Sequence, residues 1–316
     1  MSKQGNLAVV AVGGNALIKD NKHNSFADQL GVAHETAGHI AGMVAKGWNV
    51  VVTHGNGPQV GHVVRHVELA LGELPMEPMD GSGANTQGSI GYMMEQALDN
   101  IFKDRGIKKE VAAVVTQTIV DPKDQAFSNP TKPIGSFMDE ETAKARAKEF
   151  GWTVVEDAGR GWRRVVPSPL PKEIVEFPAI KTLAEAGIMV VCTGGGGIPV
   201  IRKEDGHLYG VAAVIDKDFG TAVLASNLEA DLFIISTAVP QVYINFNKPD
   251  QKALGNITLA EAEKYLAEGH FAKGSMAPKM QAVINFLKAG GKHAIITDPA
   301  HLAEAIDGKA GTHITK

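Results

Sequence analysis

Two lysines stand at predicted helix starts, where a positive charge is unfavourable. Lys217 follows Asp216, a good N-cap residue, and falls in the first turn of the helix. Lys279 follows Pro278, a residue that suits the first helical position. Because the helix dipole disfavours cations at this end, the two lysines indicate a compensating anion, such as a phosphate.

Glycine is unusually frequent and gathers in three loops. The chain has 35 glycines among 316 residues, about 11% against an average near 7%. The clusters Gly13-Gly14, Gly55-Asn56-Gly57 and Gly194 to Gly197 each follow an apolar run, and backbone N–H groups in such loops can cradle a phosphate. None of them fits GxxxxGK[ST] or GxGxxG, so neither a P-loop NTPase nor a Rossmann dehydrogenase is supported. Asn15 and Asn56 could donate to an anion or serve only as turn residues.

Other polar side chains form weaker candidates. Lys132 precedes a proline, and Arg164 belongs to a basic cluster that could bind a phosphoryl oxygen or simply face solvent on a strand. The histidines lack metal-ligand spacing, so no side-chain metal site is expected. The single cysteine, Cys192, ends an apolar run and is expected to be a buried small hydrophobe.

These residues are spaced by strands and helices that alternate along the chain. Apolar runs such as Leu7–Val12 predict strands buried on both faces, which is typical of a parallel sheet under helices. The predicted class is therefore α/β with a mainly parallel sheet, and the three glycine loops would share its carboxyl edge, where ligands bind. The further predicted strands are Asn49–Thr53, Val111–Thr116, Ile188–Cys192, Leu232–Thr237 and His293–Ile296, and the helices are Asp28–Lys46, Pro58–Leu71, Gly83–Phe102, Pro178–Ala186, Lys217–Asn227, Thr258–Glu268 and Pro278–Ala289.

The segment from about 118 to 171 interrupts this alternation. It is rich in prolines and predicts one short charged helix, Glu140–Phe150, with two short strands, Trp152–Glu156 and Arg163–Val166. We interpret it as an inserted lid subdomain between two sheet strands, with a long surface excursion as the alternative.

Composition narrows the possible binding partners and the cellular compartment of the protein. The 31 Lys and Arg against 35 Asp and Glu give a net charge of −4, which provides no general positive field for nucleic acid or an anionic membrane. The N-terminal apolar run is too short for a signal peptide or a membrane span. One cysteine excludes an internal disulfide. We expect a cytoplasmic protein.

With these features in view, the chain resembles the carbamate kinases of the amino acid kinase family. The resemblance spans nearly the whole chain, and two of its segments, NPTKPIG and RGWRRVVPSP, are specific to carbamate kinases. The matching segments are VGGNAL (12–17), THGNGPQVG (53–61), TQGSIGY (86–92), NPTKPIG (129–135), EDAGRGWRRVVPSP (156–169), GGGGIPV (194–200), AVIDKD (213–218) and GHFAKGSMAPK (269–279).

The resemblance implies a three-layer αβα sandwich of residues 1–316 with a protruding lid. It implies a homodimer that uses Mg²⁺ with ATP or ADP, the metal being carried by the nucleotide. The implied reaction is the reversible transfer of a phosphoryl group between ATP and carbamate, giving ADP and carbamoyl phosphate, used to make ATP in arginine catabolism. The acceptor site would lie in the N-terminal half and the nucleotide site in about 172–316.

The resemblance also implies residue roles. Lys132 and Lys217 would neutralise charge on the transferring group, Asp216 would orient the lysines, and Lys279 would hold the leaving ADP. The acceptor and the phosphoryl group would be bound by Gly13, Gly14, Asn15, Gly55, Asn56 and Gly57, with Arg164 on the lid. The nucleotide would be bound by Gly194, Gly195, Tyr243, Met276 and Lys279.

Two alternative functions stay open from the sequence. The first is another kinase of the family that forms an acyl phosphate on an amino acid such as glutamate or aspartate, or on acetylglutamate. The second is a catalytically silent paralogue that binds nucleotide.

Overall fold

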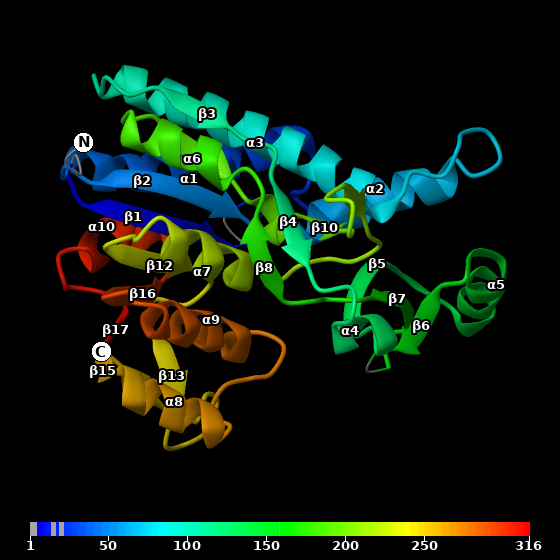
Figure 1. Cartoon of the computed structure of the whole chain (residues 1–316). Helices are drawn as coiled ribbons and strands as arrows, with labels where there is room; N and C mark the ends of the chain where they lie inside the picture. The colour runs from blue at the N-terminus through cyan, green and yellow to red at the C-terminus, as the bar shows by residue number, and fades with distance from the viewer. Residues whose placement is uncertain (1–4, 14–16, 19–21, 158) are drawn as a thin grey trace.

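A twisted sheet of eight strands forms the centre of the computed structural model, which describes residues 5–13, 17–18, 22–157 and 159–316. The strand order is β15-β17-β16-β12-β1-β2-β9-β3 (Figure 1). Neighbouring strands are parallel except β16 and β17, which pair antiparallel. The bounds are β1 Leu7–Val12, β2 Asn49–His54, β3 Val111–Ala113, β9 Met189–Cys192, β12 Leu232–Ser236, β15 Asn256–Thr258, β16 His293–Thr297 and β17 Thr312–Thr315.

Helices cover both faces of this sheet, which confirms the predicted three-layer αβα class (Figure 1). One face packs against α1 (Phe26–Ala45), α3 (Met79–Asp104) and α10 (Leu302–Ala305). The other packs against α6 (Phe177–Glu185), α7 (Lys217–Asn227), α8 (Leu259–Ala267) and α9 (Met276–Lys288).

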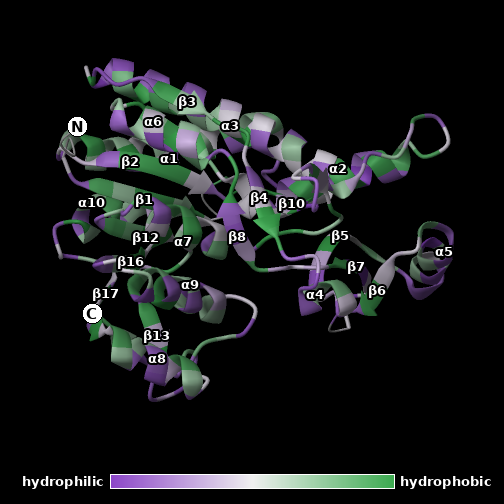
Figure 2. Ribbon diagram, viewed as in Figure 1, coloured by the Kyte–Doolittle hydropathy of each residue, from purple (hydrophilic) through white to green (hydrophobic). Residues whose placement is uncertain are grey.

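The alternation of strand side chains explains the two apolar layers. Val9 and Ala11 of β1 belong to one buried cluster, whereas Ala8 and Val10 belong to the other. Successive residues of a strand point to opposite faces, so a strand covered on both sides must be apolar throughout. Figure 2 accordingly shows the central strands β1 and β2 as mostly hydrophobic. None of the helices in the described ranges is long and apolar enough to cross a membrane.

Beside the main sheet, two smaller sheets carry the inserted segment. In the first, β4 (Gln117–Val120) pairs antiparallel with β8 (Pro171–Ile174) and parallel with β10 (Ile198–Arg202), and β10 pairs antiparallel with β11 (Leu208–Gly210). In the second, β5 (Lys132–Met138), β7 (Trp162–Val166) and β6 (Thr153–Glu156) lie with α5 (Glu140–Phe150) away from the main body (Figure 1). We call residues 121–170 the lid.

The remaining elements of the described residues are two helices, two 3₁₀ turns and a β-hairpin. They are α2 (Gly57–Leu69), α4 (Gln125–Ser128), the 3₁₀ turns Gly194–Gly196 and Pro299–His301, and the hairpin of β13 (Val242–Ile244) with β14 (Lys252–Leu254). The lid contains a third strand, β5, that the sequence did not predict, because its proline and glycine argue against a strand.

Candidate active site

A cavity of about 400 Å³ lies at the carboxyl edge of the main sheet, where β1, β2 and β12 end. Its walls come from the glycine loops, the start of α2, the first lid strand, and the starts of α7 and α9. The residues that line it are Gly13, Gly55, Asn56, Gly57, Pro58, Val60, Lys132, Pro133, Ile134, Gly195, Val214, Ile215, Asp216, Lys217, Asp218, Thr237, Ala238, Gly274, Ser275, Pro278 and Lys279.

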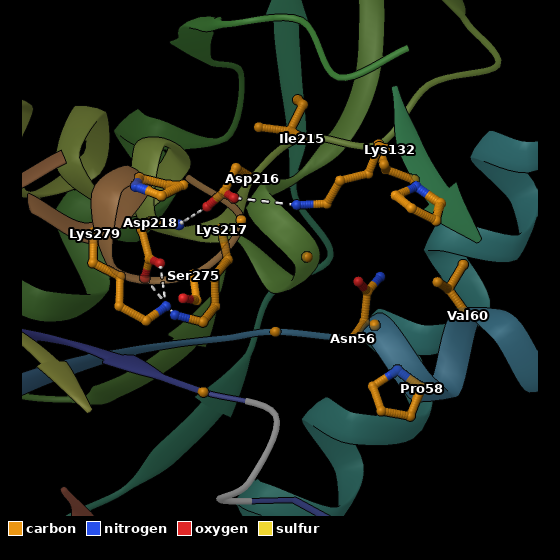
Figure 3. Close-up of a pocket in the computed structure, with 18 of the residues that line it drawn as sticks. Asn56, Pro58, Val60, Lys132, Ile215, Asp216, Lys217, Asp218, Ser275 and Lys279 are labelled. Carbon is orange, nitrogen blue, oxygen red and sulfur yellow. Dashed lines mark hydrogen bonds and ion pairs between the residues drawn. The ribbon is translucent and has the colours of Figure 1, made fainter. Parts of the chain in front are cut away.

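One buried carboxylate holds two of the three predicted lysines (Figure 3). Asp218 Oδ1 pairs with Lys217 Nζ, and Asp218 Oδ2 accepts a hydrogen bond of 2.9 Å from Lys279 Nζ. The side chain of Asp218 is only 3% exposed. The two ammonium groups are thereby brought together at one end of the cavity, although their residues lie 62 positions apart in the sequence.

The environment of this triad shifts the pKa values of Lys217 and Asp218. Desolvation lowers the pKa of Lys217, and the charge of Lys279 lowers it further, while Asp218 opposes both. Burial alone would raise the pKa of Asp218, but the ammonium groups of Lys217 and Lys279 hold it below its usual range. The carboxylate is therefore charged, and it stabilises two cations where water cannot.

The local sequence explains why the start of α7 places Lys217 and Asp218 at the cavity. Asp216 caps the helix by accepting a hydrogen bond of 3.0 Å from the backbone N–H of Asp218. Gly220, one turn later, packs on the third glycine loop, and a Cβ there would lie 2.7 Å from the carbonyl oxygen of Gly196. Only glycine permits this close approach, which sets the helix start against the cavity.

The third lysine reaches the cavity from the lid. Lys132, the first residue of β5, donates a hydrogen bond of 3.2 Å to Asp216 Oδ2 (Figure 3). Asp216 therefore contacts Lys132, while Asp218 contacts the other two lysines. Asp216 was the aspartate predicted from the sequence to orient the lysines, whereas Asp218 was not predicted, since an aspartate in a first helical turn is an ordinary dipole partner.

The glycine loops complete the walls. Gly13, Gly55 and Gly57 line the cavity, as does Asn56. Gly195 lines it from the opposite loop, with a left-handed φ of +63°. Gly14 and Asn15, also predicted to bind the acceptor, lie outside the described residues.

Four predicted residues lie elsewhere. Arg164 of β7 does not line the cavity; it stacks on the ring of Trp152 at 4.5 Å, beside a separate cavity of about 280 Å³ between the lid and α2. Gly194 lines a smaller cavity of about 160 Å³. Tyr243 lies in the hairpin beside Phe246, and Met276 starts α9 and packs against the core. The nucleotide roles of these last three residues, and the phosphate role of Arg164, stay predictions.

Two titratable groups behind the glycine loops are buried. Cys192 is 2% exposed, and burial raises its thiol pKa to about 12, so the side chain is a neutral apolar group at neutral pH. His54, at the end of β2, is fully buried, and desolvation lowers its pKa to about 4. It is therefore a neutral imidazole at neutral pH.

The carboxylates of the cavity are committed to protein partners. Both oxygens of Asp218 face lysines, and those of Asp216 face Lys132 and a backbone N–H. Among the described residues, no group of three or more His, Cys, Asp or Glu side chains could hold a metal ion. The donor set therefore does not fit a Mg²⁺ ion held by these side chains alone.

Known proteins resemble this chain over nearly its whole length. The profile of the amino acid kinase family matches residues 6–298. Carbamate kinase of Thermococcus kodakarensis is 51% identical over 311 residues, which cover 98% of each chain. Carbamate kinase 2 of Enterococcus faecalis is 51% identical over 314 residues, which cover 98% of this chain and 99% of its own.

A solved structure agrees with these relatives. Carbamate kinase from Giardia lamblia bound to AMP-PNP superposes with a TM-score of 0.94 and 46% identity, covering 99% of each chain. The sequence profile, the relatives and the fold therefore agree, and the chain belongs to the amino acid kinase family.

Proposed function

We propose that this protein catalyses the reversible reaction ATP + carbamate ⇌ ADP + carbamoyl phosphate. The observation that carries the proposal is the convergence of three lysines, from the lid, α7 and α9, on one cavity at the sheet edge. Relatives at about half identity over nearly their whole length are named carbamate kinases, which supports the choice of acceptor.

The chemistry requires charge stabilisation more than acid–base catalysis. Carbamate is an anion whose carboxylate oxygen is already a nucleophile. That oxygen forms a bond to the γ-phosphorus of ATP, and the bond from this phosphorus to the β–γ bridging oxygen breaks, leaving ADP. Such a transfer depends on positioning and on neutralising charge at the phosphoryl oxygens.

The roles of the polar residues follow from their contacts. Lys132 and Lys217 neutralise the transferring group, and Lys279 the bridge to the leaving ADP. Asp218 holds Lys217 and Lys279 side by side through its two oxygens. Asp216 holds Lys132 at the mouth of the cavity. The backbone N–H groups of the glycine loops bind the acceptor and the phosphoryl oxygens.

Mg²⁺ enters this proposal as a companion of the nucleotide. Since the cavity carboxylates are engaged by lysines, the metal would be held by phosphate oxygens and water. When bound there, it would draw negative charge from the phosphates.

We further propose that the protein acts as a cytoplasmic homodimer and supplies ATP during arginine catabolism. The resemblance to carbamate kinases supports this part of the proposal. Light scattering on the eluting peak of a sizing column tests the dimer, and a mass near one chain would contradict it.

One assay tests the proposed reaction and its rivals. Purified protein with Mg²⁺ and ADP should form ATP from carbamoyl phosphate, above a control for spontaneous breakdown, and should not phosphorylate acetylglutamate, glutamate or aspartate with ATP. ADP binding without ATP formation would favour a silent nucleotide-binding protein. Phosphorylation of an amino acid would favour another branch of the family.

A further inference from the structure

The side-chain amide of Asn56 is held in one orientation by a chain of hydrogen bonds. Asn56 Nδ2 donates to Thr86 Oγ1 over 2.8 Å, and Thr86 Oγ1 donates to the carbonyl oxygen of Gly83 over 2.7 Å. A carbonyl oxygen can only accept, so it takes the single hydroxyl proton of Thr86. The hydroxyl oxygen must then accept from Asn56, which is possible only if the NH₂ end of the amide faces Thr86.

The same constraint turns the carbonyl end of Asn56 toward the cavity. In Figure 3 the amide points into the cavity, with its oxygen on the side of Lys217. No other described residue donates a hydrogen bond to this oxygen. Gly195 supports the amide from behind, since a Cβ at Gly195 would collide with the Asn56 side chain.

An acceptor oxygen is an unexpected lining for a cavity that receives anions. The carbonyl of Asn56 would repel a carboxylate or phosphate oxygen and would bind an N–H group. Carbamate and carbamoyl phosphate both carry an NH₂ group on the reacting carbon, whereas acetate and acetyl phosphate carry a methyl group of similar size. A site whose acceptor oxygen hydrogen-bonds a substrate N–H group binds the methyl analogue less well, because the methyl group leaves that oxygen unpaired.

We propose that Asn56 Oδ1 accepts a hydrogen bond from the NH₂ group of the substrate, and that Thr86 is the positioning residue that sets this specificity. The proposal rests on the proposed function and deepens it. Thr86 is 1% exposed and does not line the cavity, so it acts through Asn56 and not by touching substrate.

Thr86→Val tests this role because valine keeps the shape of threonine and removes the hydroxyl. The readout is the ratio of kcat/KM for carbamoyl phosphate to kcat/KM for acetyl phosphate, with ADP as the phosphoryl acceptor. We expect this ratio to fall by about tenfold, the cost of one hydrogen bond, through loss of efficiency with carbamoyl phosphate. If acetyl phosphate turns over too slowly, its inhibition constant against carbamoyl phosphate replaces its kcat/KM.

Two further variants separate positioning from structure. Thr86→Ser restores the hydroxyl and should restore the ratio. Ser82→Ala removes another buried hydroxyl of α3, bonded to the carbonyl of Pro78 at 3.3 Å, and should leave the ratio unchanged. Thermal unfolding of each variant shows whether it is folded at the assay temperature, and Thr86→Ala, which also lacks the hydroxyl, carries the comparison if the valine variant is not.

The outcomes distinguish this inference from the proposed function. A wild-type protein that forms no ATP from carbamoyl phosphate would overturn the proposed function. An active wild type whose Thr86→Val variant loses both donors equally, or keeps the ratio, would overturn only the role of Thr86 and Asn56. A serine variant that behaves like the valine variant would overturn it as well.

Discussion

Asp218 is the residue on which the lysine arrangement depends. Its single carboxylate pairs with two ammonium groups in a place where burial lowers the pKa of Lys217. Breaking such a buried network by removing one charge leaves the others uncompensated, which costs far more than the net value of the pair.

Replacing Asp218 by asparagine should therefore reduce both turnover and stability. We expect kcat to fall by about 10²–10³, as when one preorganised electrostatic group is lost, and the free energy of unfolding to fall by about 3 kcal/mol. The alkaline limb of the pH–rate profile should also move to lower pH, because Lys217 loses the anion that favours its charged form. Asp121→Asn, at an exposed pair with Lys172, is the control. A variant with unchanged kcat would remove Asp218 from the mechanism.

The structure changes the effect on folding stability that we expect from replacing Lys217. The dipole alone predicts that Lys217→Ala holds or slightly raises stability. The structure shows the cation paired with a carboxylate that is 3% exposed, so removing it leaves that carboxylate with one partner. We expect the urea midpoint to fall and kcat to drop by about 10²–10³. Lys181→Ala, at the exposed pair with Glu185, controls for loss of a surface lysine. A higher midpoint would show that the dipole term outweighs the pair.

At the residue scale, the sequence predicted the charges but not their pairing. Lys217, Lys279 and Lys132 were selected because helix dipoles and a resemblance pointed to them. Their convergence on Asp218 and Asp216 could not be predicted, because it depends on where α7, α9 and the lid meet in space. Thr86 was included only as the first residue of the matching segment TQGSIGY, with no role assigned, because its contact with Asn56 depends on the fold.

Among the elements, the lid contacts the body through apolar packing, ion pairs and a backbone hydrogen bond from Val214 N–H to the carbonyl oxygen of Pro167 at 3.0 Å. Ile134 and Val166 join Val60 and Val64 of α2 in a small apolar cluster. Arg146 of α5 forms an ion pair of 2.7 Å with Glu68, whose side chain is 9% exposed. Lys132 completes the attachment at Asp216. We predict that the lid opens when the site is empty and closes on nucleotide and acceptor, which would exclude water.

The lid prediction is tested first at Lys132. Lys132→Ala should lower kcat by about 10²–10³ while the dissociation constant for ADP stays nearly unchanged, because Lys279 and the C-terminal half hold the nucleotide. Equilibrium binding of ADP decides the question. If ADP affinity falls in step with kcat, the division between lid and nucleotide half is wrong.

Glu68→Gln provides the second test, remote from the chemistry. The variant keeps the shape of the side chain and removes the charge that holds α5, so it should lower kcat by about fivefold, equivalent to roughly 1 kcal/mol, without changing ADP affinity. Lys144→Gln removes an ion pair internal to α5 and is the matched control. Equal kinetics for the two variants would show that the Glu68 pair does not position the lid.

The elements that local patterns specify well were predicted well. Leu7–Val12, Glu140–Phe150 and Lys217–Asn227 have the predicted bounds, because an apolar run or a good N-cap residue marks each start. The helix predicted from Gly83 begins instead at Met79, since tertiary packing extends it through glycines that propensity disfavours. Strand β5 was missed for the same kind of reason, because its pairing with β7 overrides the effect of its proline, Pro133.

At the scale of the whole molecule, the central sheet both positions the active-site loops and forms the hydrophobic core. Parallel strands end at one edge, so the loops after β1, β2 and β12 meet around a single cavity while their apolar residues fill two layers. The α/β class follows from the alternation of strands and helices. The strand order could not be predicted, because it depends on contacts between segments far apart in the chain.

The position of His54 at the end of a central strand couples the stability of the whole fold to pH. Desolvation lowers its pKa from 6.5 to about 4, so the unfolded chain binds a proton between these values and the folded chain does not. The free energy of unfolding should therefore decrease as pH falls from 6.5 toward 4, by about 3 kcal/mol in total. His293, whose pKa burial also lowers, adds in the same direction. The pKa of the Asp218 carboxyl is lowered, so the stability that this group contributes is lost only at more acidic pH.

A variant comparison isolates this contribution. His54→Gln cannot take up the proton, so its free energy of unfolding should change less between pH 7 and pH 4.5 than that of the wild type, whatever its absolute value. Urea unfolding at a series of pH values measures both slopes, and His62→Gln, at an exposed position of α2, controls for the loss of an imidazole. Parallel pH slopes for wild type and His54→Gln would show that His54 is not the group whose burial makes the fold sensitive to mild acid.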